Sequence, residues 1–289
     1  MGFTVGPTNG QTGARTAAGG VPYPSVWEQF MRDMTTGKRW LDMVDPERAS
    51  SSINTNNLVW TGAQTQVDAP QVLGFRPELE IQGPPSVRGL YEVSLAAFGP
   101  PLTATGIKDI LITAIDTGGA SLFDGCEPYS TRGDESVKGR IALVDRGTCT
   151  FTTKVKNAQL AGAIGVVVAN NTPSGLPAIG GSDPTITIPS IGISQSLGRS
   201  LRALPQMSNN GRGGVPVTMQ LSTTIRAGTT GGFVRLYAPN PYEPGSSVSH
   251  WDTSLTPNVL MEPFVNPGLS QQLTPPRDLT FSLLRDLGW

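Results

Sequence analysis

Histidine is the residue type that most limits the possible chemistry of this chain, because the 289 residues contain only one, His250. Catalytic zinc sites use three protein ligands, and histidines commonly supply two or three of them. A complete histidine-based zinc site therefore cannot be assembled from this chain alone. A Ser-His-Asp triad needs one histidine, but the sequence lacks the Gly-x-Ser-x-Gly elbow. It also lacks a Walker A loop and a Gly-x-Gly-x-x-Gly fingerprint, so nucleotide-cofactor chemistry is not indicated.

The two cysteines, Cys126 and Cys149, are the other residues with potential chemistry. They do not form the Cys-x-x-Cys spacing of a redox site, and they lie in a turn-rich stretch. In an oxidising compartment such a pair serves as a structural cross-link. We therefore expect a disulfide between them, with a pair of buried free thiols as the alternative.

The composition indicates a folded, turn-rich protein. Charged residues make up 15% of the chain, the formal net charge is −1, and there are 35 glycines and 25 prolines. A hydrophobic share of 37% is too high for a chain that is disordered for lack of a core. No run of Lys or Arg is present, so we expect neither nucleic acid nor an anionic membrane surface as a partner. The longest nearly apolar run, 161–169, is too short to span a bilayer.

The compartment is inferred from composition rather than from a targeting signal. The first residues lack the basic and apolar regions of a signal peptide, and Gly6 stands where myristoylation requires Ser or Thr. Few lysines and many Thr, Ser, Gly, Asn and Pro residues are typical of proteins outside the cytoplasm. We therefore expect an extracellular or periplasmic protein whose export signal lies upstream of Met1.

The pattern of apolar residues predicts an α+β protein. Helical spacing follows the N-cap candidate Ser25, starts again at Asp45-Pro46, and ends the chain in a helix capped by Asp278. Between 84 and 225 the texture changes to β-branched runs divided by Gly and Pro turns. Strands are expected at 91–98, 107–115, 140–144, 164–168 and 215–221, with a helix at 151–162. This order predicts a split domain, 1–83 and 226–289, into which a β-rich module, 84–225, is inserted.

The inserted region carries a family resemblance. The run Gly139-Arg140-Ile141-Ala142-Leu143-Val144-Asp145-Arg146-Gly147 is followed by Cys149, Phe151, Lys154, Asn157-Ala158-Gln159 and Ala161-Gly162-Ala163. This series, with Ile186 to Ser194, resembles the protease-associated (PA) domain. The resemblance implies a sandwich-like or barrel-like β module with peripheral helices. It also implies a module that binds peptides or restrains substrate access beside a protease catalytic domain, without being catalytic itself.

The flanking segments are similar to a different family. Ser249-His250-Trp251-Asp252, Leu260-Met261-Glu262-Pro263 and the terminal Asp286-Leu287-Gly288-Trp289 resemble the C-terminal part of leishmanolysin-like metzincin zinc peptidases. That resemblance implies that His250 is the third zinc ligand and that Met261 forms the methionine turn beneath the metal. Met1-Gly2-Phe3 resembles the end of the family's His-Glu-x-x-His helix. Val259 departs from the acidic residue often found there.

Two functional hypotheses follow. The first is the C-terminal portion of a secreted zinc metallopeptidase with a PA domain, inactive as given because two zinc ligands and the general base are missing. The family's zinc is then not expected to bind tightly to this chain, since one imidazole supplies little of a site's affinity. The second is a non-catalytic protein that binds proteins or peptides through its PA module. Plain structural roles remain the alternatives for His250 and Met261. Under the first hypothesis, residues 1–3 and Met261 should lie near the His250 ring.

Overall fold

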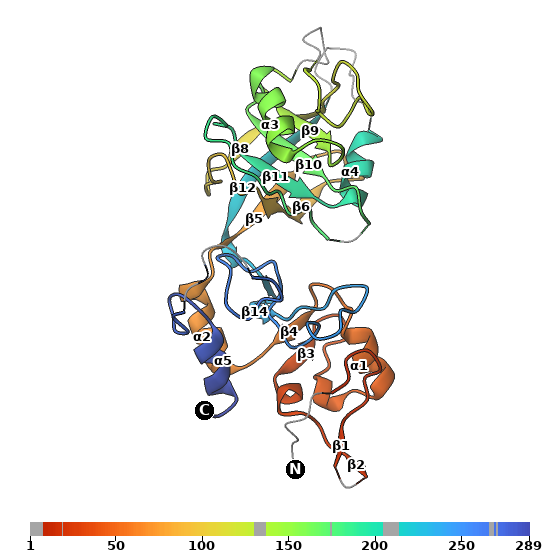
Figure 1. The fold of residues 1–289 in the computed structure, drawn as a ribbon, viewed down its shortest axis with the longest axis vertical. Coiled ribbons are helices and arrows are strands. Elements are labelled where there is room, and N and C mark those ends of the chain that lie inside the picture. Colours follow the sequence, from red (N-terminus) through yellow and green to blue (C-terminus); the bar gives the residue numbers. More distant parts are fainter. Residues whose placement is uncertain are drawn as a thin grey trace. The chain divides into compact units, whose positions relative to one another are not determined.

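The computed structural model describes residues 8–18, 20–129, 137–173, 175–204, 214–265, 269 and 271–289. The chain divides into two compact units (Figure 1). One combines Met1–Arg76 with Thr224–Trp289, and is called the split unit below; the other, Pro77–Thr223, is called the central unit. The assignment of 84–225 to a PA domain and of the flanks to a peptidase remnant stays a prediction.

The central unit is built on a single mixed sheet. Its strands are β5 (Phe75–Ile81), β6 (Gly89–Glu92), β7 (Ser94–Leu95), β8 (Ile107–Thr113), β9 (Ile141–Asp145), β10 (Gly165–Ala169), β11 (Ser190–Ile193) and β12 (Val215–Arg226). The order in the sheet is β6-β5-β12-β8-β9-β10-β11-β7, with β8, β9, β10 and β11 parallel. The unit is therefore β-rich, as expected.

This sheet is nearly closed on itself. Its two edge strands, β6 and β7, are separated in sequence only by Val93, so the edges must come close together. A sheet that closes in this way leaves few unpaired edge groups exposed. The chain enters the unit through β5 and leaves it through β12, which are neighbours in the sheet, and the Gln82 N–H donates to the Pro216 carbonyl at 3.0 Å. Adjacent entry and exit strands are what an insertion between two segments of another domain requires.

The alternation of side chains along the parallel strands fills two cores. On β9, Ile141 and Leu143 join one cluster while Ala142 and Val144 join the other. The second cluster is covered by α3 (Phe151–Leu160), and α4 (Gln195–Arg202) contributes to the first. Because side chains alternate with period two, strands buried on both faces read as continuous apolar runs.

The split unit contains short strands and helices drawn from both ends of the chain. Its elements are β1 (Ala17–Ala18), β2 (Val21–Pro22), the 3-10 helices η1 (Val26–Gln29) and η2 (Trp40–Asp42), β3 (Met31–Asp33), α1 (Asp45–Ser51), β4 (Leu58–Trp60), α2 (Ala63–Val72), β13 (Thr229–Thr230), β14 (Phe233–Arg235) and α5 (Thr280–Asp286). The sheet order β13-β14-β4-β3 interleaves strands from the two segments. The two segments therefore fold as one unit.

Tryptophans form the centre of the split unit. Trp40, Trp60 and Trp251 are each at most 1% exposed. Trp60 lies 5.0 Å from Trp27 and 6.3 Å from Trp251 between ring centroids, both in edge-to-face arrangements. Such pairs add to the stabilisation from burial. Trp251 belongs to the C-terminal segment and Trp60 to the N-terminal one, so this core also joins the two segments.

Asp286, near the end of α5, caps the N-terminus of α2, which lies beside α5 (Figure 1). Its carboxylate accepts hydrogen bonds from the Gln64 N–H (2.7 Å), the Thr65 N–H (3.2 Å) and the Thr65 hydroxyl (2.6 Å). It also accepts one from Trp60 Nε1 at 2.9 Å. A carboxylate at a helix N-terminus satisfies free N–H groups and complements the helix dipole. The Cβ of any residue other than glycine at position 62 would lie 2.0 Å from this carboxylate.

Several predicted elements differ in detail. The helix expected after Ser25 is wrong beyond Gln29, because Met31–Asp33 pairs with β4 as a strand. The predicted cap Asp45 is the first helical residue instead, and Glu47 Oε2 accepts the N–H of the N-cap Val44 at 3.1 Å. The strand expected at 91–98 is two short strands, β6 and β7. Asp278 Oδ1 accepts the N–H of Thr280, the first residue of α5, at 2.7 Å.

Candidate functional site

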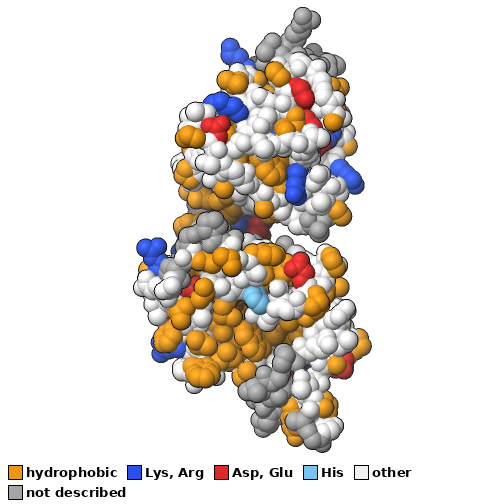
Figure 2. Space-filling model, viewed as in Figure 1, with side chains coloured by type: hydrophobic (Ala, Val, Ile, Leu, Met, Phe, Trp, Pro, Cys, Tyr) orange, Lys and Arg blue, Asp and Glu red, His pale blue; other side chains and the backbone are white. Residues whose placement is uncertain are grey.

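The loop around His250 in the split unit is the first candidate site. The ring is half-buried, and its Nδ1 lies 2.9 Å from the Ser246 carbonyl oxygen and 3.0 Å from Ser249 Oγ. The chain's one histidine is visible at the surface, bordered by hydrophobic side chains (Figure 2). Among the described residues, the hydrogen bonds of the ring all involve Nδ1.

This contact fixes the chemistry of the ring. A carbonyl oxygen can only accept, so Nδ1 carries the proton in its bond to Ser246. In the neutral imidazole, Nε2 then keeps its lone pair for a metal ion or a proton. A backbone carbonyl on Nδ1 is a common way of orienting a histidine that ligates a metal through Nε2.

The backbone brings the His250 loop beside Met261. The Trp251 N–H donates to the Met261 carbonyl at 2.9 Å, and the His250 carbonyl accepts the Tyr237 N–H at 2.8 Å. Trp251 is fully buried, and Met261 is partly buried against the same core. The methionine-turn role of Met261 stays a prediction. The expected approach of Met1-Gly2-Phe3 lies outside the described residues.

Three buried carboxylates hold the segment that follows His250. Asp278 Oδ2 accepts the Leu260 N–H at 2.6 Å, and Glu262 Oε1 accepts the Val259 N–H at 3.0 Å. Asp252, which is 5% exposed, accepts the Ser254 N–H at 2.9 Å. Burial raises the pKa of Glu262 to about 7, against the effect of the Val259 N–H, and the charges of Asp252 and Asp278 raise it further.

Glu262 makes the stability of the split unit depend on pH. Its folded-state pKa is raised from 4.5 to about 7, so its contribution is fully present below pH 4.5 and is lost as the pH rises through about 7. We expect Glu262→Gln, which keeps an acceptor for Val259, to be about 2 kcal/mol more stable than the parent at pH 8.5 and equal to it near pH 4.5. Urea unfolding at both pH values measures the difference. An equal change for Glu47→Gln, an exposed carboxylate of the same unit, would contradict this explanation.

The described residues do not complete a metal site around His250. Among the described His, Cys, Asp and Glu residues, the one group of three or more whose ligand atoms lie close enough to hold a single ion is Asp116, Asp124 and Glu127. His250 is not in it. At the predicted third-ligand position, the described residues therefore show a single imidazole ring, oriented by the Ser246 carbonyl.

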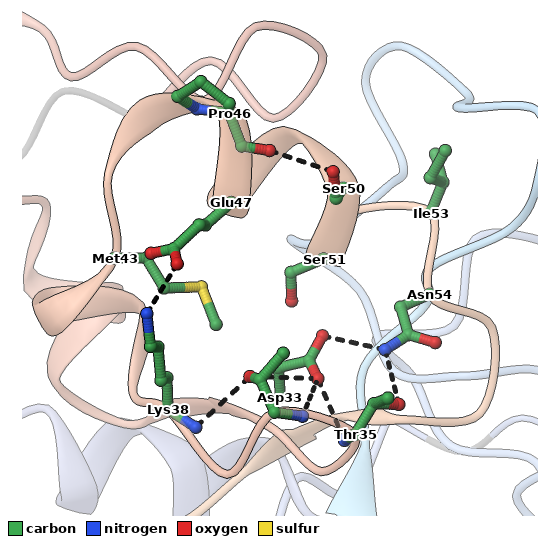
Figure 3. A pocket seen from close by; sticks show the side chains of 11 residues that line it. Asp33, Thr35, Lys38, Met43, Pro46, Glu47, Ser50, Ser51, Ile53 and Asn54 are labelled. Carbon is green, nitrogen blue, oxygen red and sulfur yellow. Dashed lines mark hydrogen bonds and ion pairs between the residues drawn. The ribbon is translucent and has the colours of Figure 1, made fainter.

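A second candidate is a hollow of about 520 Å³ between α1 and the turn after β3 (Figure 3). At its base, Asp33 Oδ1 accepts the N–H groups of Thr35 and Thr36, and Oδ2 accepts the Asn54 amide at 2.8 Å. Burial pushes the pKa of Asp33 up, but these hydrogen bonds outweigh it and hold the pKa below its ordinary value. Lys38 and Glu47 form an ion pair at the rim. The carboxylate of Asp33 is thus held ionised by the hydrogen bonds of the turn and of Asn54.

The cysteine prediction is confirmed. Cys126 and Cys149 form a disulfide with their Cα atoms 5.7 Å apart, and no cysteine is free. The bond ties the loop after β8 to the turn before α3. The strand β9 lies within the segment that the disulfide closes, and α3 and then β10 follow Cys149 in the chain.

Residues 118–201 match the family model described as the PA domain. The chain contains a PA domain. Vacuolar-sorting receptor 2 of Arabidopsis thaliana is 36% identical to this chain over 134 residues. The matched segment covers 43% of this chain and 21% of the receptor. Leucine aminopeptidase 2 of Trichophyton equinum is 37% identical over 108 residues, which are 37% of this chain and 20% of the aminopeptidase. The chain thus spans about a fifth of the length of these curated relatives.

Among solved structures, a zinc aminopeptidase from Bacillus subtilis is similar in fold to part of this chain. The match covers 52% of this chain and 31% of the aminopeptidase chain, with 24% sequence identity and a TM-score of 0.36. A subtilisin-like protease from Pseudoalteromonas sp. AS-11 covers 52% of this chain with a TM-score of 0.35. None of the described helices is both long enough and apolar enough to cross a membrane. The family match to residues 118–201 confirms the PA resemblance, and the metzincin resemblance rests on the flanking motifs alone.

Proposed function

We propose that this chain is the PA-domain and third-ligand portion of an extracellular or periplasmic zinc metallopeptidase, in which His250 binds the metal through Nε2. The observation that carries the proposal is the bond from His250 Nδ1 to the Ser246 carbonyl, which leaves Nε2 of this surface imidazole without a hydrogen bond to the described residues and available as a ligand atom. The backbone bond between Trp251 and Met261 supports it, because it holds the methionine segment beside the histidine loop.

The described residues supply one ligand of such a zinc site, His250, but not the complete ligand set. A catalytic zinc ion needs three protein ligands and an open position, and within the described ranges no second ligand stands with His250. The remaining ligands and the general base would come from residues outside this chain. We therefore expect neither tight zinc binding nor peptide hydrolysis from these 289 residues alone.

In this proposal the PA domain engages protein or peptide substrates. Its nearly closed sheet is filled by two apolar cores, so it offers a rigid surface rather than a catalytic cavity. The relatives named as aminopeptidases support a place beside a peptidase, and the one named as a vacuolar-sorting receptor supports protein binding. The disulfide supports an oxidising compartment.

The test uses the product of the whole gene from its native start codon, beside the 289-residue chain. We expect the whole product to contain one zinc ion per chain by mass spectrometry and to cleave casein, with both lost on chelation. His250→Ala should lose the zinc and the cleavage, because no other histidine of this region can replace the ligand. Val265→Ala, at a side chain that is 96% exposed, is the surface control and should retain both.

Full zinc content and activity in His250→Ala would refute the ligand role. A whole product that holds no zinc and cleaves nothing, yet binds peptides equally well with and without His250→Ala, would establish the second candidate. That candidate is a non-catalytic protein-binding PA chain, and the 36% identity to the vacuolar-sorting receptor favours it.

A further inference from the structure

Three carboxylates of the central unit converge beside the disulfide. Asp116 and Asp124 are each only 3% exposed, and Glu127 is half-buried. One carboxylate oxygen from each of these residues lies within 4.8 Å of the others. Ligand oxygens lie about 2.3–2.6 Å from a calcium ion, so two oxygens of one site are separated by no more than about 5 Å. The three side chains are therefore close enough to share one ion.

Two polar atoms at this cluster have no hydrogen-bond partner among the residues that the structure describes. Tyr129 is 5% exposed and its hydroxyl is unpartnered, and so is the buried Oε2 of Glu127. The Tyr129 hydroxyl lies 2.0 Å from the place that a Cβ of Gly125 would occupy, and the Gly125 N–H donates to Asp116 at 2.9 Å. Buried polar atoms are almost always satisfied by protein, water or an ion. Both orphaned atoms thus point to a ligand at the cluster.

The local charge has the magnitude and sign that a divalent cation requires. Lys154 is fully buried, and its Nζ donates to the Asp124 carbonyl at 2.6 Å and to Cys126 Sγ at 3.3 Å. Its ammonium offsets one of the three carboxylates. Two negative charges remain in a site with little access to water, where unpaired charge is costly.

Glycines shape the wall of the cluster. A Cβ at Gly119 would lie 2.4 Å from one oxygen of Glu127 and 2.5 Å from the other. The backbone of Gly119 has a φ of +81°, a conformation that glycine adopts readily. Glu127 can therefore rest its carboxylate directly against the main chain at Gly119, with Oε2 as the nearer oxygen.

We propose that Asp116, Asp124 and Glu127 bind a single calcium ion, with the Tyr129 hydroxyl facing the ion directly or through a bound water. Oxygen-only ligands favour calcium over zinc, which prefers nitrogen and sulfur. The neighbouring sulfur atoms of Cys126 and Cys149 are in a disulfide and offer no thiolate. The ion would hold together the loop between β8 and β9, which carries all three carboxylates, next to the disulfide. This inference concerns the PA region and does not depend on the role of His250.

The test titrates the 289-residue chain with CaCl₂ after removal of metal ions by chelation. We expect calorimetry to give one ion per chain with a dissociation constant below about 1 mM, the range of extracellular calcium modules. The melting temperature of the central unit should rise with calcium in a saturable way. Glu127→Gln should weaken binding at least tenfold, since it removes a ligand charge whose Oε2 makes no hydrogen bond to the described part of the chain.

Glu80→Gln provides the matched control, because it removes the same charge from β5 of the same sheet, outside the cluster. It should bind calcium like the parent chain. The far-UV spectrum and the intact disulfide establish that Glu127→Gln is folded. Absence of a saturable calcium signal in the parent chain would overturn the proposal. Equal binding by Glu127→Gln and the parent would overturn it as well.

Discussion

Replacing Asp286 by Ala is expected to destabilise the split unit by about 4 kcal/mol. The carboxylate accepts four hydrogen bonds, and two of its donors, Trp60 Nε1 and the Thr65 hydroxyl, belong to residues that are fully buried. Bonds to a charged acceptor contribute about 1.5–3 kcal/mol each, and a buried donor left without a partner adds its desolvation cost. The four do not add fully because they share one group. Calorimetry should show the transition of this unit lowered by about 10 °C.

Two variants on the same helix separate the cap from the helix itself. Asp286→Asn keeps an acceptor oxygen but loses the charge, so it should cost roughly half as much. Arg285→Ala removes an exposed neighbouring side chain and should change the stability by less than about 0.5 kcal/mol. If Asp286→Ala and Arg285→Ala had equal effects, the carboxylate would not be the contact that joins α5 to α2.

The parallel β-α-β part of the central unit could be predicted from sequence. The apolar runs of β9 and β10 and the helical spacing of α3 are local patterns, and a strand buried on both faces has no polar alternation to confuse the assignment. The PA motif covers the same stretch. The disulfide was also predictable, because the chain offers a single possible pairing.

The elements that were missed lack such local patterns. The helix α2 carries Pro70 near its end and exposes Val67, so it has no continuous apolar stripe. The strand β5 contains Pro77, which usually argues against a strand within a sheet. Both are held by contacts distant in sequence: α2 by Asp286 and β5 by its neighbour β12 in the sheet. No window of the sequence contains both partners.

Tertiary pairing also explains the wrong helix after Ser25. The spacing of Phe30 and Met34 suits a helix, but Met31 pairs with Trp60 across the sheet. The fully buried Glu28 accepts the Ser25 N–H at 3.0 Å and so closes the short 3-10 turn. The same limit applies to the carboxylate cluster, since Asp116, Asp124 and Glu127 follow one another in the chain without a recognisable calcium-loop pattern. Their convergence depends on the Asp116 to Tyr129 bridge, which only the fold provides.

Removing the disulfide is expected to destabilise the central unit by about 3 kcal/mol. Cys126 and Cys149 close a segment with a sequence separation of 23, and the chain-entropy model assigns about 3 kcal/mol to a loop of that length. Cys126→Ala combined with Cys149→Ala should therefore lower the melting temperature of this unit by about 10 °C. Adding a reductant to the parent chain should reproduce the shift, while the double variant should not respond to it.

Which of the two units has its melting temperature lowered is as informative as the size of the decrease. The disulfide and Asp286 lie in different compact units with separate cores, so each substitution should move the transition of its own unit. Breaking the disulfide also frees the two turns that carry Asp124 and Thr148, whose side chains are bonded at 2.7 Å beside Lys154. Calcium binding should then weaken together with the stability of the central unit and leave the split unit unchanged. A double variant that melts like the parent would show that hydrogen bonds, rather than the cross-link, hold these turns.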